Sequence, residues 1–191
     1  MKQIPNHINI RIDEDIVLKL IDEQYADSIF KLIESNRIYL GKWLPWVDLS
    51  ISVNDTKEYI RSSLKRYADN NGFDCVIFYH NQVIGQIGLH KINHTSKSTS
   101  IGYWMGASFQ GHGIMTRSCK AMINYCFDEL GLDIIEIKCA GYNIRSRAIP
   151  ERLQFNLVRE FHENEPISGI VRTFSLYVMQ RANWSNSNSI T

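Results

Sequence analysis

The sequence predicts one mixed α/β domain in which strands outnumber helices. Apolar residues follow a period near two in some segments and near 3.6 in others, and no linker divides the chain. The 191 residues suffice for one domain with its own hydrophobic core. A third observation is that residues 73–80 and 83–90 both have the pattern of a strand and are separated by Asn81 and Gln82 alone, which predicts a β-hairpin.

The elements before this hairpin are a strand pair and two helices. Residues 8–20 predict a strand, a turn at residues 13–15 and a second strand. Residues 23–35 carry apolar side chains at helical spacing behind Asp22, a residue type preferred at the N-cap. Residues 55–68 repeat that spacing, with Asn54 or Asp55 as the cap.

The elements after the hairpin begin with a strand at residues 100–105. Residues 114–130 give the clearest helix, with one apolar stripe formed by Met115, Cys119, Met122, Ile123, Cys126, Phe127 and Leu130. Then come a strand at 134–139, a short helix near 147–153 and strands at about 156–163 and 170–179. We expect residues 1–180 to form the domain, and the Asn- and Ser-rich residues 181–191 to form a loose polar tail.

The composition narrows the classes of function. There are 21 basic and 20 acidic residues and the net charge is +1, without the basic excess typical of a nucleic-acid binder. The four cysteines form no C-x-x-C pair and have no His cluster nearby, so we expect buried reduced thiols rather than a metal site. With neither a signal peptide nor an apolar run of membrane-spanning length, the expected location is the cytoplasm.

Two glycines between the strand at 100–105 and the long helix predict an anion site. The first turn of a helix has N–H groups without partners, and the helix dipole adds positive charge there. Gly111 and Gly113 allow the loop to curl and direct more N–H groups to one point. The loop lacks the Lys of a Walker A motif and the third glycine of a dinucleotide fingerprint. From the glycines alone, a turn without a ligand remains the alternative.

The residues around these glycines resemble a known family. The run Gln110-Gly-His-Gly-Ile-Met is similar to the Q/R-x-x-G-x-G/A pyrophosphate loop of the GNAT N-acetyltransferases, with Met115 where Gly or Ala is usual. The runs GYWMG at 102–106, NIRSRAIPERLQF at 143–155 and WLPW at 43–46 resemble the branch that acetylates ribosomal-protein N-termini. The resemblance covers about residues 8–179.

This resemblance implies a mostly antiparallel mixed sheet with splayed central strands, flanked by helices. The pantetheine arm of acetyl-CoA, the co-substrate, would lie along residues 100–106 beside 134–139. The residues implied in binding acetyl-CoA are Met105, Gln110, Gly111, His112, Gly113, Ile114, Met115, Thr116, Asn143 and Ser146. For Asn143 the alternative is a turn role. No metal is expected, and the family's frequent dimers suggest a homodimer.

Acyl transfer from a thioester to an amine needs a neutral amine, a polarised carbonyl and a proton for the departing thiolate. The resemblance assigns the base to Glu165, with Glu163 as the nearest substitute and a solvated Glu as the alternative. It assigns carbonyl polarisation to a backbone N–H at or near Met105. Thiolate protonation goes to Ser146, for which helix capping is the alternative role. Tyr142 is a poorer candidate for the acid.

The acceptor is expected to be the N-terminal α-amine of a protein such as a ribosomal protein. An α-amine has a pKa of ~8 against ~10.4 for lysine, so a modest base acting through water is enough. Arg37, Trp43 and Trp46 are implied at the acceptor entrance, with core packing as the alternative for the tryptophans. Gln154 replaces the family's Gly, and the family's acceptor-side aromatic residues are missing from residues 156–172. A small-amine acetyltransferase, acting on a polyamine or antibiotic, and a non-catalytic acyl-CoA-binding module are therefore the alternative functions.

Overall fold

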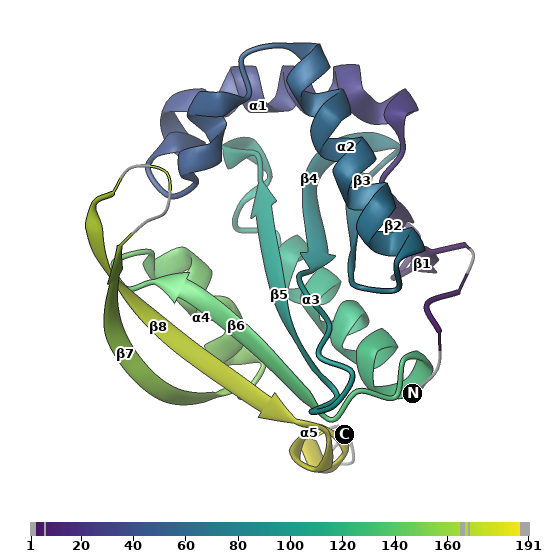
Figure 1. Ribbon diagram of the computed structural model, residues 1–191, viewed down its shortest axis with the longest axis vertical. Helices are drawn as coiled ribbons and strands as arrows, with labels where there is room; N and C mark the ends of the chain where they lie inside the picture. The colour runs from purple at the N-terminus through teal and green to yellow at the C-terminus, as the bar shows by residue number, and fades with distance from the viewer. Residues whose placement is uncertain (1–2, 6, 165–166, 168, 188–191) are drawn as a thin grey trace.

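The computed structural model describes residues 3–5, 7–164, 167 and 169–187, and within them the chain forms one eight-stranded sheet with helices on both faces (Figure 1). In chain order the strands are β1 (Asn9–Arg11), β2 (Ile16–Leu20), β3 (Phe73–Tyr79), β4 (Gln82–Leu89), β5 (Ser98–Met105), β6 (Ile134–Ala140), β7 (Asn156–Asn164) and β8 (Val171–Gln180). The helices are α1 (Ala26–Gly41), α2 (Val53–Ala68), α3 (Ile114–Asn124), α4 (Ile144–Arg152) and α5 (Arg181–Ser187). Shorter helical turns are η1 (Glu23–Tyr25), η2 (Pro45–Leu49), η3 (Ala107–Phe109) and η4 (Tyr125–Glu129).

The sheet is mixed and mostly antiparallel, as predicted. Its strand order is β1-β2-β3-β4-β5-β6-β8-β7, and only the β5–β6 pair is parallel. Because parallel strands need a crossover connection, α3 lies between β5 and β6 in the chain. Figure 1 shows α1 and α2 over one face of the sheet and α3 and α4 behind the other.

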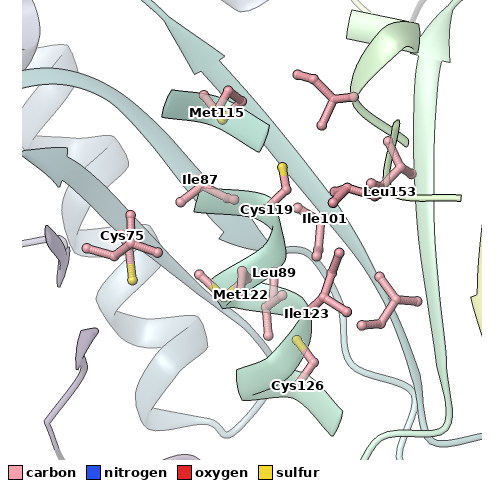
Figure 2. Packing of buried hydrophobic residues seen from close by; sticks show 14 of the residues in the cluster. Cys75, Ile87, Leu89, Ile101, Met115, Cys119, Met122, Ile123, Cys126 and Leu153 are labelled. Atoms are coloured by element: carbon pink, nitrogen blue, oxygen red, sulfur yellow. The ribbon is translucent and has the colours of Figure 1, made fainter. Parts of the chain in front are cut away.

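The larger core cluster lies between the sheet and α3. Figure 2 shows side chains of α3 interdigitating with those of β4 and β5. The helix stripe that the sequence predicts is the buried stripe, since Cys119, Met122, Ile123 and Cys126 all have no exposed surface. Burial of an apolar side chain of this size contributes roughly 1.5–3 kcal/mol. All four cysteines are free and buried, as predicted.

Several element ends differ from the prediction because side-chain caps decide them. The cap of α2 is Ser52, whose Oγ accepts from the N–H of Asp55 at 3.3 Å, while the Asp55 carboxylate accepts from the N–H of Ser52 at 2.7 Å. Asn54 and Asp55 are therefore inside the helix. The two-residue hairpin turn is His80 and Asn81, both with positive φ (47° and 62°), one residue earlier than predicted.

The prediction of a loose tail is wrong for Arg181–Ser187, which form α5. Trp184 is 6% exposed, and its indole Nε1–H donates to Asn124 Oδ1 at 2.7 Å. A single Trp among polar residues produces no periodic apolar pattern in the sequence. Its indole nevertheless packs against Phe127 of η4 and holds the segment in place. Residues 188–191 lie outside the described part of the chain. In the part that is described, no helix has the length and apolar character to cross a membrane.

Candidate active site

The centre of the sheet opens where β5 and β6 separate. The two strands pair only at Ser98–Ile134, Thr99–Ile135 and Ser100–Glu136, and then diverge toward their C-terminal ends (Figure 1). This confirms the predicted splay, and its cause is that β6 continues alongside β8 while β5 follows β4. The facing backbone edges of β5 and β6 are therefore unpaired beyond Ser100 and Glu136, and we call this separation of the two strands the slot.

The backbone of β5 offers polar groups to this slot. Ser100 O accepts from His90 N at 2.9 Å, and Gly106 N donates to Ile84 O at 2.9 Å, so the even-numbered residues of β5 pair with β4. Backbone groups in an antiparallel pair alternate in direction along the strand. The N–H and C=O groups of Tyr103 and Met105 therefore face the slot, where β6 has already moved away.

The glycine loop at the end of β5 has the geometry of an anion site. Gly111 and Gly113 adopt positive φ angles of 85° and 69°, and a Cβ added to either would meet no atom within 4 Å. The glycines are thus needed for backbone conformation, and the space beside them is open. Because no side chain caps α3, the N–H groups of its first turn, residues 114–116, are directed toward this open side.

The side chains of the loop face different ways. Ile114 and Met115 are buried in the core, which fixes the start of α3 and places Met115 away from the open side. This explains why a large residue fits where Gly or Ala is usual. His112 is exposed, and its carbonyl accepts from Arg117 Nη2 at 3.4 Å. Arg117 also pairs with Asp13 of the β1–β2 turn.

Two side chains of the loop region contact neighbouring helices. The Gln110 amide donates to Tyr39 Oη of α1, and its carbonyl oxygen accepts from Arg145 of α4. Thr116 Oγ1 accepts from Arg152 Nη1 at 3.0 Å, also of α4. The loop is therefore connected to both helices that flank the slot.

A cluster of hydroxyl and thiol groups lies where α4 meets β5 and β6. Ser146 Oγ is 3.2 Å from Cys139 Sγ and 3.4 Å from Tyr103 Oη. The Tyr103 hydroxyl donates to the Ser146 carbonyl at 3.0 Å, which is free to accept because Pro150, four residues on, has no N–H. Burial raises the pKa of the Tyr103 phenol and of the Cys139 thiol, so both stay protonated at neutral pH.

The helix α4 is capped by Asn143, not by Ser146. Asn143 Oδ1 accepts from the N–H of Ser146 at 3.2 Å, and Ser146 occupies the third position of the helix. Capping as the sole role of Ser146 is therefore wrong. Since the Asn143 oxygen is used by the cap, any contact with a ligand falls to its amide nitrogen.

On the other face of the sheet, Arg37 holds the turn that carries the tryptophans. Its guanidinium donates to Val47 O at 2.5 Å and to Ser50 O at 2.6 Å, and pairs with Glu34. Trp46 packs against the ring of Trp104 with centroids 5.8 Å apart, so core packing accounts for its position. Trp43 is half-buried. Arg37 thus orders the segment.

Glu165 lies outside the described residues. Its nearest substitute, Glu163, accepts from Lys138 Nζ at 2.8 Å, and that ammonium group lies 4.8 Å from the centre of the Phe174 ring. Glu160 pairs instead with Arg147 at 3.2 Å. Because side chains alternate along a strand, Glu160 and Glu163 face opposite sides of the sheet.

Four residues that contact the glycine loop or Ser146 were not predicted from the sequence, namely Tyr103, Cys139, Arg145 and Arg152. Tyr103 stands within the GYWMG run, next to Trp104, which packs in the core cluster that includes residues of α1. Because side chains alternate along a strand, Tyr103 could have been placed on the opposite face, toward α4. Arg145 and Arg152 are seven apart in the NIRSRAIPERLQF run, which puts them on one side of a helix.

Comparison with known proteins supports this picture. A family model described as an acetyltransferase (GNAT) domain matches residues 15–156. A Bacillus subtilis (strain 168) protein named as a candidate ribosomal N-acetyltransferase, YdaF, is 31% identical over 91% of this chain and 96% of its own length. The ribosomal-protein-serine acetyltransferase of Escherichia coli (strain K12) is 27% identical over 78% of this chain and 83% of its own length.

A solved structure extends the comparison to the fold. The microcin C7 self-immunity acetyltransferase MccE, in complex with acetyl-CoA and AMP, superposes with a TM-score of 0.84 at 26% identity, over 88% of this chain and 94% of that one. The splayed sheet and the uncapped glycine loop match the donor site that such an enzyme needs. The chain belongs to the GNAT family of acetyltransferases, and it is an acetyl-CoA-dependent N-acetyltransferase.

Proposed function

We propose that the chain acetylates the N-terminal α-amine of a ribosomal protein in the cytoplasm. The observation that carries this proposal is the similarity over nearly the whole chain to relatives named for ribosomal acetyl transfer. The acceptor would approach from the face covered by α1 and η2. There Arg37 holds the η2 turn, and Arg172 Nη1 of β8 donates to Lys42 O at 2.9 Å, which ties the two sides of the entrance together.

The acyl donor fits the slot with its phosphates at the glycine loop. The N–H groups of residues 111–116 would bind the pyrophosphate, since they lack a capping side chain. The pantetheine arm would pair with the slot-facing backbone of Tyr103 and Met105, taking the place of the missing strand. This arrangement brings the thioester toward Ser146 and Cys139.

The proposed chemistry is direct attack of the neutral amine on the thioester carbonyl. The Met105 N–H would stabilise the negative charge that develops on the carbonyl oxygen. As the C–N bond forms and the C–S bond breaks, Ser146 would donate its proton to the leaving sulfur and recover one from solvent. The amine would lose its proton through water to a carboxylate, for which Glu165 is the candidate and Glu163 the substitute.

A thiol-release assay tests this function. The chain would be given acetyl-CoA and peptides that begin with the N-terminal sequences of ribosomal proteins, with Ser-initiated and Ala-initiated peptides first. We expect release of one thiol per peptide acetylated, and a lower kcat for Glu165→Gln than for Glu163→Gln. Absence of release with every peptide, while CoA still binds, would refute the acceptor class and leave the donor site intact.

A small-molecule amine is the second candidate acceptor. It is favoured by the likeness to MccE, a self-immunity enzyme whose structure holds AMP beside acetyl-CoA. A polyamine fits poorly, because a polycation needs several carboxylates on one face and Glu160 and Glu163 face opposite sides of the sheet. Competition between a reactive peptide and a panel of nucleotide-linked and aliphatic amines separates the two acceptors.

We also propose that the chain forms a homodimer. The expectation comes from the resemblance in sequence to a family in which dimers are common. Sedimentation velocity across a concentration series measures the state directly, and a single monomeric species at high micromolar concentration would contradict the proposal.

A further inference from the structure

The helix α4 has two faces with different charge environments. On one face, Arg147 lies 3.2 Å from Glu160 and 3.8 Å from Glu151, and donates to Tyr177 Oη at 3.0 Å. Tyr177 in turn donates to Glu151 Oε1 at 2.7 Å. The positive charge of Arg147 is therefore compensated by two carboxylates, and this face attaches α4 to β7 and β8.

The other face carries two arginines without such compensation. Arg145 and Arg152 are seven residues apart, so they lie on the same side of the helix, roughly 10 Å apart along its axis. Their hydrogen bonds go to neutral oxygens, those of the Gln110 amide and the Thr116 hydroxyl. Within the described residues, neither guanidinium has a carboxylate within 4 Å.

Both contacts lie at the glycine loop, one at each end of it. A third cation near this loop, Arg117, is already paired with Asp13. Uncompensated positive charge next to uncapped N–H groups is costly to hold unless an anion binds there. Coenzyme A brings two anionic groups, a pyrophosphate and a 3′-phosphate on the ribose. The main-chain amides of a six-residue loop match the pyrophosphate but leave the 3′-phosphate without a cation.

We propose that this arginine pair of α4 binds the phosphates of coenzyme A, and that Arg152 is the residue that selects for the 3′-phosphate; the proposal rests on the donor site described above. Arg145 contacts Gln110, the end of the loop nearest to Tyr103 and the slot. Arg152 contacts Thr116, beyond the loop and away from the slot. Since the 3′-phosphate lies on the far side of the pyrophosphate from the pantetheine arm, Arg152 is the arginine within its reach.

Calorimetric binding of CoA and of 3′-dephospho-CoA, without any acceptor, tests the proposal. The unchanged chain should bind CoA about 10-fold more tightly than 3′-dephospho-CoA, the size expected for one charge-assisted hydrogen-bonding group. Arg152→Gln should weaken CoA binding about 10-fold and leave 3′-dephospho-CoA binding within about 2-fold, which abolishes the preference. Arg145→Gln should weaken both ligands by a similar factor, because both carry the pyrophosphate.

Two further variants control for charge and folding. Lys65→Gln removes one exposed positive charge on α2 and should leave both affinities unchanged, while Arg152→Lys should restore part of the preference for CoA. Circular dichroism checks that each variant is folded. Equal affinity of the unchanged chain for the two ligands, or an equal loss for both with Arg152→Gln, would overturn the proposal. Because no acceptor is present, failure to acetylate peptides would leave this result standing, whereas failure of CoA to bind would refute the donor site itself.

Discussion

At the scale of single residues, Asn143 and Ser146 differ in role, because Asn143 caps α4 and Ser146 is the proposed acid. Asn143→Ala removes the side-chain cap of α4 and should lower the free energy of unfolding by about 1 kcal/mol. Ser146→Ala leaves that cap in place and should change stability by less, but it should lower kcat roughly 100-fold if the hydroxyl protonates the leaving thiolate. Urea unfolding and steady-state kinetics on the same two variants give the answer. Equal losses of stability with unchanged kcat would contradict the acid role.

Gln154 is a second residue whose effect can be measured directly. Gln154 adopts a left-handed φ of 60° just after α4. The turn therefore has the backbone conformation that favours glycine, and a side chain with a Cβ atom is strained in it. Gln154→Gly should therefore raise the free energy of unfolding by about 1 kcal/mol. Gln154→Ala retains the Cβ atom and serves as the control, with no gain expected. A glycine variant no more stable than the alanine variant would argue against strain.

Single residues were predictable from the sequence where one backbone conformation or one cap requires a particular residue type. Gly111 and Gly113 are examples, because their positive φ angles leave few alternatives. The substrate contact of Arg37 stays a prediction, and its hydrogen bonds to Val47 O and Ser50 O were not predictable because they depend on how α1 and η2 meet. Tyr103 was missed for a similar reason, since its partner is a carbonyl freed by a proline in a different element.

At the scale of elements, Tyr103 replaces a hydrogen bond that α4 cannot make. The Ser146 carbonyl would normally accept from the N–H four residues later, and Pro150 has none. Tyr103→Phe should cost about 1 kcal/mol of stability in the natural sequence and less in a Pro150→Ala background, where the helix supplies its own donor. A double-mutant cycle in urea measures this coupling, and additive losses would show that the two groups act independently.

The helix α5 should contribute to stability in spite of its polar composition. Trp184→Ala removes a buried indole that packs 6.4 Å from the Phe127 ring, and it should cost about 3 kcal/mol. Trp184→Phe keeps most of the packing and loses only the hydrogen bond to Asn124, so we expect a loss of about 1 kcal/mol. Thermal and urea unfolding of both variants provide the measurement. If Trp184→Ala unfolded like the unchanged chain, α5 would be dispensable for stability.

The elements themselves were largely predictable, whereas their ends were not. The apolar stripe of residues 114–130 predicted the long helix after the glycine loop, whose last turn is the π-helical η4. The ends of α2 and α4 depend on Ser52 and Asn143, which are two of many polar residues in their segments. Nothing in the apolar period marks which polar side chain folds back onto the backbone.

At the scale of the whole molecule, the sheet consists of two halves joined by the short β5–β6 pairing. A donor whose pantetheine arm lies in the slot would pair with the free edge of β5 and lie beside β6, so donor binding should stiffen the junction of the two halves. We expect hydrogen exchange at the Tyr103 and Met105 amides to slow at least 10-fold with saturating acetyl-CoA. The Trp104 amide, which faces β4, is the internal control and should change much less. Equal slowing at all three positions would indicate general stabilisation only.

The overall topology could be predicted from the sequence, because the segment that most resembles the GNAT family, residues 102–155, includes the C-terminal half of β5, the helix α3 and all of β6. The acceptor side that we propose was not within reach of the sequence. The elements proposed to form it, α1, η2 and β8, are far apart in the chain, and contacts between them, such as that of Arg172 with Lys42, follow no local pattern.

The burial of the four cysteines has a practical consequence for following catalysis. Because burial raises the pKa of the Cys75, Cys119, Cys126 and Cys139 thiols, almost none of them is a thiolate at neutral pH while the chain is folded. A disulfide dye that reacts with free thiolates will therefore colour in proportion to the CoA set free at each turnover, with little background from the enzyme. The same dye added in denaturant will count four protein thiols per chain, so one reagent reports both turnover and the fraction of folded enzyme.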